Sequence, residues 1–162
     1  RNLLTMSTSV NDLIEASSTY CLNQVPTKPW TNLTCGDHTL ALESDADEQL
    51  LLHIGFRQTL KLEKITLGLP KNDTCPSEVS IFVNLNSPGF SDCEGKAAFK
   101  GTIDEDAGEV TFSLPAVKFN RVESITLFVS ENHGGDISSM HRIALQGQSV
   151  MNTDVSKIHE SK

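Results

Sequence analysis

The sequence LESDADEQLLLHIGF, residues 42–56, joins a run of acidic side chains to a strongly apolar segment. The carboxylates fall within six positions, at Glu43, Asp45, Asp47 and Glu48. The apolar residues that follow recur at every second position, at Leu50, Leu52, Ile54 and Phe56. This is the period of a β-strand with one buried face. Because carboxylates are costly to bury, we predict a charged loop at the rim of the fold that leads into a core strand.

Further segments show the same alternation, at residues 60–62, 65–69, 79–85, 110–114, 125–129 and 143–145. The parity of the apolar positions switches between Leu62 and Ile65. One extra residue there, in a β-bulge or at a crossing between two sheets, would keep a single face buried. Strands without intervening helices predict an all-β sandwich or barrel.

One short helix is expected near the amino terminus. Val10, Leu13 and Ile14 have helical spacing, and Ser9 and Asp12 are placed as a reciprocal capping pair. A chain of 162 residues is long enough for one domain. We place this domain at residues 9–150 and expect flexible termini at 1–8 and 151–162, because the chain is polar from Gln148 onward.

The charge balance narrows the possible partners. Lys and Arg total 13 against 21 Asp and Glu, a formal net charge of -8, which disfavours binding to nucleic acid or to an anionic membrane. No apolar run is long enough to span a bilayer or to form a signal-peptide core, so we expect a soluble protein. For the same reason we expect the four cysteines to be reduced and the sequons at Asn32 and Asn72 to be unused.

No pattern of catalytic residues is evident. The five histidines are scattered and no nucleophile lies in a recognisable motif. His53 is predicted on the strand face opposite Leu52, as an ordinary surface or second-sheet histidine. Read as an EF-hand loop from Asp45, the sequence has Leu50 where a glycine is needed and Phe56 where an acid is needed, so this motif fails. We therefore predict no enzymatic activity, no cofactor and no metal, although a calcium site of another type stays open.

Several segments together resemble the PITH domain, the carboxy-terminal domain of proteasome-interacting thioredoxin-like proteins that also exists as a stand-alone protein. The matching segments are YCLN at 20–23, KPW at 28–30, residues 42–51, KL at 61–62, VKFNRV at 117–122, SITLFV at 124–129 and IALQG at 143–147. The resemblance implies a jelly-roll-like β-sandwich similar to galactose-binding domains. It also implies a domain without its own enzymatic activity that docks on the proteasome regulatory particle, in the cytoplasm and nucleus.

The leading hypothesis is therefore a monomeric, non-catalytic, intracellular module that docks on the proteasome or another large assembly. The residues proposed for partner binding are Glu43, Asp45, Asp47, Glu48, Trp30 and His159, the last with Ile158 in the tail. Two interpretations stay open for the acidic run, since its oxygens could equally fix the loop by accepting backbone N–H groups. Trp30 could likewise be a binding anchor or a lid over the core.

The alternative function is a small-ligand module that binds carbohydrate or calcium, as sandwiches of this kind can. Aromatic side chains that could stack on a sugar are few, with one Trp and one Tyr in the chain.

Overall fold

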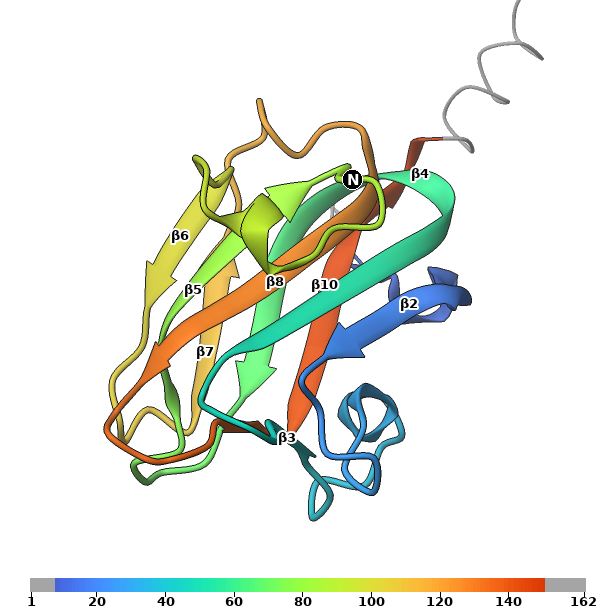
Figure 1. The fold of residues 1–162 in the computed structure, drawn as a ribbon. Coiled ribbons are helices and arrows are strands. Elements are labelled where there is room, and N and C mark those ends of the chain that lie inside the picture. Colours follow the sequence, from blue (N-terminus) through green and yellow to red (C-terminus); the bar gives the residue numbers. More distant parts are fainter. Residues whose placement is uncertain (1–7, 151–162) are drawn as a thin grey trace, which may run out of the picture.

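The computed structural model describes residues 8–150. Within them the chain forms ten strands and three short 3-10 helices (Figure 1). The strands are β1 (Thr8–Ser9), β2 (Ile14–Leu22), β3 (Leu42–Glu43), β4 (Leu50–Gly68), β5 (Pro76–Val83), β6 (Phe99–Thr102), β7 (Glu109–Ser113), β8 (Val122–Asn132), β9 (Ser139–Met140) and β10 (Arg142–Ser149). The 3-10 helices are η2 (Asn11–Leu13), η3 (Trp30–Leu33) and η4 (Phe90–Cys93). In this part of the chain no helix has both the length and the apolar character to cross a membrane.

The long strand β4 belongs to both layers of the structure. Residues 50–55 pair with β2 on one side and β8 on the other. Residues 64–68 pair instead with β7 and β10. Figure 1 shows β4 bending at the upper right and returning through the second layer. One layer therefore has the order β2-β4-β8-β5-β6 and the other β7-β4-β10-β1, so the predicted all-β sandwich is confirmed.

The predicted change of parity within β4 is a β-bulge. Gln146 of β10 pairs with Lys64, but the next residue, Gly147, pairs with Leu62, which leaves Glu63 as the extra residue. Leu62 and the apolar residues on both sides of it are almost fully buried. A side chain at position 147 would collide with the backbone of β4, so this position needs glycine.

The predicted helix at the amino terminus is wrong. Only Asn11–Leu13 form a single 3-10 turn, and strand β2 begins at Ile14. The side chain of Asn11 bonds to β10 instead, donating to the carbonyl of Ile143 and accepting the N–H of Leu145 at 2.8 Å. These tertiary bonds, and the pairing of both ends of β2 with β4, override the helical spacing.

The apolar core lies between the two layers. It is built from the inward residues of β4, β5, β8 and β10 and is closed by Phe119, which is fully buried. All four cysteines are free thiols, as predicted, and only Cys35 is exposed. Burial raises the pKa of the Cys21 thiol to about 12 and that of Cys75 and Cys93 to about 11.

The outer face of the first layer is covered only in part. Residues 84–98 fold across it and bury a second, smaller apolar cluster around Leu51, Phe82 and Cys93. Beyond this cluster lies His53, on the face opposite Leu52 as predicted, but 6% exposed rather than on the surface. Its Nδ1 lies 2.9 Å from the hydroxyl of Thr126, and its ring lies against Tyr20. Burial lowers the pKa of His53 below its ordinary value of 6.5.

This lowered pKa predicts a loss of stability in acid. Below pH 6.5 the unfolded chain binds a proton at His53 that the folded chain resists, so the free energy of unfolding falls as the pH decreases. In the His53→Asn variant the amide can keep the bond to Thr126 but does not titrate. We expect this variant to lose less stability than the native chain between about pH 7 and about pH 5 in thermal unfolding. Equal losses of stability in the two proteins would contradict a lowered pKa of His53 as the cause.

Candidate functional site

The acidic loop, residues 44–49, is held by one side chain from the end of the neighbouring strand. Asn23 has a left-handed backbone, with φ of 71°, a conformation that Asn tolerates better than most residues. Its side chain accepts the N–H of Ala46 at 3.0 Å and donates to the Asp47 carboxylate at 2.9 Å and the Gln49 carbonyl at 2.7 Å. Its own carbonyl accepts the N–H of Asp45. Asn23 therefore fixes the loop at four points.

The four carboxylates of residues 43–48, at and just before this loop, have different roles. Glu43 forms an ion pair with Lys28 at 3.2 Å. Asp47 accepts the N–H of Gln49 at 3.0 Å as well as the Asn23 amide, as an Asx-type turn does. The side chains of Asp45 and Glu48 have no bond within the described residues, and Asp45 is exposed. The structural interpretation thus fits Asp47, and Glu43 is held by Lys28 instead of by a backbone N–H. Asp45 and Glu48 are available to a partner.

A second acidic run, Asp104 to Asp106, reaches the same end of the sandwich. Ser138 joins the loop after β8 to the acidic loop, since its hydroxyl donates to the Glu48 carbonyl at 2.6 Å. The ring of His133 in turn lies 2.7 Å from the carbonyl of Ile103, directly before the second run. These loops gather at the lower end of Figure 1.

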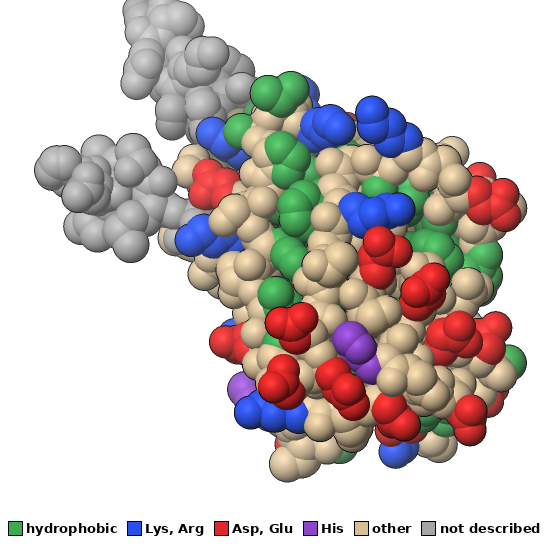
Figure 2. Space-filling view, turned by 90° about the vertical axis from the view of Figure 1, so that its left-hand side faces the viewer, with side chains coloured by type: hydrophobic (Ala, Val, Ile, Leu, Met, Phe, Trp, Pro, Cys, Tyr) green, Lys and Arg blue, Asp and Glu red, His purple; other side chains and the backbone are tan. Residues whose placement is uncertain are grey.

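We call this surface the acidic end. It comprises Glu43, Asp45, Asp47, Glu48, Asp73, Asp104, Glu105, Asp106, Glu131 and Asp136, most of them exposed. Figure 2 shows carboxylates gathered over the lower half of one face. Both acidic runs are visible in the sequence, but residue spacing does not predict that they meet.

The remaining residues predicted for partner binding are Trp30, Ile158 and His159. Trp30 is half-buried and packs against the main core, and its backbone N–H donates to the Gln24 side chain at 2.8 Å. This position agrees with the interpretation as a lid. Ile158 and His159, like the predicted flexible segments other than Thr8, lie outside the described residues.

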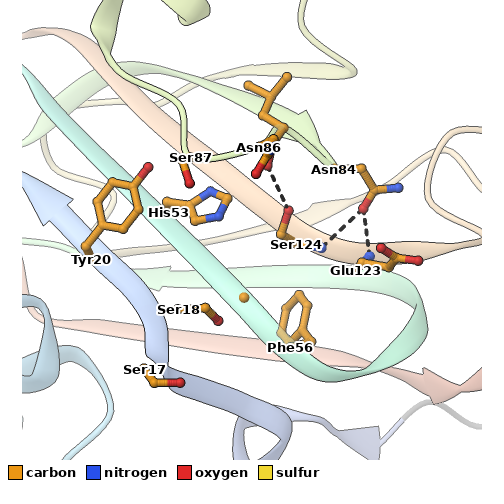
Figure 3. Close-up of a pocket in the computed structure, with 12 residues that line it drawn as sticks. Ser17, Ser18, Tyr20, His53, Phe56, Asn84, Asn86, Ser87, Glu123 and Ser124 are labelled. Atoms are coloured by element: carbon orange, nitrogen blue, oxygen red, sulfur yellow. Dashed lines mark hydrogen bonds between the residues drawn. The ribbon is translucent and has the colours of Figure 1, made fainter.

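A separate hollow of about 680 Å³ opens on the outer face of the first layer. We call it the sheet-face hollow. Its walls come from four segments, two of them in β2 and β4, one in the loop after β5 and one in β8. The lining residues are Ser17, Ser18, Tyr20, His53, Gly55, Phe56, residues 84–87, Glu123 and Ser124, and Figure 3 shows their side chains. Hydroxyl and amide groups dominate the lining, with the rings of Tyr20, His53 and Phe56 between them. Sequence reasoning missed this site, because strand parity placed His53 on the outer face without showing what surrounds it.

The Asn23 contacts predict a clear difference between two single substitutions. Asn23→Ala removes the side-chain bonds to the acidic loop and should lower the free energy of unfolding by about 1 to 2 kcal/mol, which lowers Tm by several degrees. Asp45→Ala removes an exposed carboxylate without a bond in the described structure, so its Tm should stay close to that of the native chain. Thermal unfolding of both variants at one pH is the measurement. Equal Tm values would mean that Asn23 does not hold the loop.

Similar solved structures support the fold. The family 32 carbohydrate-binding module from C. perfringens NanJ, solved in complex with galactose, superposes with a TM-score of 0.69 at 12% identity. The alignment covers 86% of this chain and 98% of that one. A second Clostridium perfringens module, CpGH89CBM32-5, gives a TM-score of 0.66, also at 12% identity, over 85% of this chain and 99% of that one. At such identities the likeness shows the fold alone, and it confirms the predicted galactose-binding-like jelly-roll sandwich.

Related sequences cover most of the chain. The PITH domain-containing protein 1 of Homo sapiens is 31% identical over 122 residues, which are 75% of this chain and 57% of that protein. That of Danio rerio is 31% identical over 83% of this chain and 67% of its own length. Thioredoxin-like protein 1 of Schizosaccharomyces pombe is 27% identical over 94% of this chain. The chain thus spans between about half and two thirds of these relatives. Because the PITH domain also matches residues 2–162, the chain belongs to the PITH domain family.

Proposed function

We propose that this chain is a non-catalytic protein-interaction module that docks through its acidic end onto a basic surface of a large protein assembly. The observation that carries the proposal is the meeting of two acidic runs, distant in sequence, at one end of a PITH domain. The PITH family and its thioredoxin-like member favour the proteasome regulatory particle as the assembly.

Electrostatics suits the acidic end to such a role. The chain carries a net charge of -8, and most exposed carboxylates of the acidic end have no cationic partner in the described structure. Like charges held together produce a field that steers a basic partner during approach and penalises an acidic one. Since Asn23 already fixes the loop, binding there orders few further groups.

The proposal includes the setting in which docking occurs. The chain acts as a monomer in the cytoplasm and nucleus, where proteasomes are found, and needs no cofactor, nucleic acid or membrane. The net negative charge supports the exclusion of the last two partners, because both surfaces are anionic.

The alternative of a small-ligand module has unequal support for its two ligands. No observation favours calcium, because the described residues contain no group of three or more His, Cys, Asp or Glu that could hold a metal ion. The sheet-face hollow, in contrast, is a site of suitable size for a small organic ligand.

Charge reversal tests the docking proposal. The double variant Glu105→Lys and Asp106→Lys changes two exposed residues of the acidic end whose side chains form no bond in the described structure. We expect its affinity for purified proteasome regulatory particle to fall at least about tenfold, because attraction is replaced by repulsion. Binding of the labelled chain, measured by fluorescence anisotropy, provides the readout.

A matched control keeps the same change in net charge. Glu94→Lys with Glu123→Lys reverses two exposed carboxylates outside the acidic end, and this variant should bind like the native chain apart from a small long-range effect. If both double variants lose affinity equally, net charge rather than the acidic end governs binding. If neither loses affinity, the docking proposal fails.

A further inference from the structure

The sheet-face hollow contains the ring of His53, one nitrogen of which has no partner within the described residues. His53 is 6% exposed, and its Nδ1 is engaged by the Thr126 hydroxyl at 2.9 Å. Its Nε2 has no hydrogen bond within the described residues, where no fully buried side-chain nitrogen or oxygen lacks a partner. Nε2 must therefore reach the open space of the hollow. In Figure 3 the ring stands between Tyr20 and Asn86.

The charge of the lining selects the kind of ligand. Among the residues that the structure describes, Glu123 is the only charged one that lines the hollow, and no Lys or Arg does. A phosphate or carboxylate would therefore meet repulsion without a compensating cation. The other polar groups are hydroxyls and side-chain amides, such as those of Ser18, Ser124 and Asn86, which exchange hydrogen bonds with neutral hydroxyl groups in either direction.

The aromatic rings add an apolar contribution. Tyr20 and Phe56 both line the hollow, and each is partly exposed. The Tyr20 hydroxyl is held at 2.7 Å by the carbonyl of Pro88, which fixes the position of its ring. Partly exposed rings suit a ligand that carries C–H groups between its hydroxyls, and a site with apolar surface and a few placed polar groups is typical of small-molecule binding.

The wall formed by residues 84–87 has a backbone conformation that is held by hydrogen bonds within the protein. Asn84 and Ser87 both adopt left-handed backbone conformations, with φ of 59° and 48°, which is uncommon for residues other than glycine. The Asn84 side chain accepts the N–H groups of Glu123 and Ser124 and donates to the Arg121 carbonyl at 3.0 Å. Backbone strain that the surrounding bonds maintain is found preferentially at functional sites, and a fixed wall lowers the entropy cost of binding.

We propose that the sheet-face hollow binds a neutral, polyhydroxylated small molecule of the sugar class, with Nε2 of His53 as one of its polar contacts. The volume of about 680 Å³ lies within the range of small-ligand sites. The hollow lies on the face of the first layer, formed by segments that contribute nothing to the acidic end. The proposal is therefore independent of docking, and either can fail alone.

The test is a titration of the ¹⁵N-labelled 162-residue chain, followed by amide chemical shifts. The probes are glucose, galactose, N-acetylgalactosamine, mannose and maltose, with glucose 6-phosphate as the anionic comparison. We expect at least one neutral sugar to shift amides of residues 17–20, 53–56, 84–87 and 123–124, with glucose 6-phosphate weaker than glucose. No shift from any neutral sugar, or shifts confined to the acidic end, would overturn the proposal.

Substitutions then test whether Nε2 of His53 contacts the sugar. His53→Asn keeps a group at the Nδ1 position and removes Nε2, so it should weaken binding by about two- to tenfold, the effect of one neutral hydrogen bond. Asn86→Ala, at an exposed position that does not threaten the fold, should also weaken binding. His141→Asn is the matched control, because this partly exposed histidine lies outside the hollow. Unchanged affinity in both hollow variants, or an equal loss in the control, would contradict the assignment.

Discussion

The hydrogen bonding of β4 to four other strands is the constraint on which the rest of the structure depends. Its first half pairs with β2 and β8, and its second half pairs with β7 and β10. Since one strand serves both layers, its bend and the bulge at Glu63 set how the layers face one another. The same path places both acidic runs, because β4 leaves the acidic end at Leu50 and returns to it at Gly68, where β7 begins its antiparallel pairing.

Two surfaces follow from this arrangement, and they differ in chemistry. The acidic end is charged and fixed by Asn23, whereas the sheet-face hollow is nearly neutral and built around His53. The first suits a large basic surface, which long-range attraction brings into place. The second suits a small neutral ligand, for which short hydrogen bonds and apolar contact matter more. A module with both features could hold an assembly at one surface and a small molecule at the other.

Much of the fold could be predicted because strand alternation is a local signal. The parity switch between Leu62 and Ile65 predicted either a bulge or a crossing between sheets at this point, and the structure has the bulge there. The side of His53 followed from its position in the strand. The amino-terminal helix was predicted wrongly because Asn11 bonds to β10, a contact that no local pattern contains. The meeting of the two acidic runs and the walls of the hollow depend on topology and long-range packing, so residue spacing alone could not reveal them.

Electrostatic docking through the acidic end is the central claim, and the salt dependence of association tests it most directly. The rate constant for binding to purified proteasome regulatory particle would be measured in stopped-flow experiments from about 50 mM to about 300 mM NaCl. Over this range the Debye screening length becomes much shorter. The account predicts that this rate constant falls steeply with salt for the native chain and much less for the variant with Glu105 and Asp106 reversed. A rate constant that does not change with salt in the native chain would contradict it.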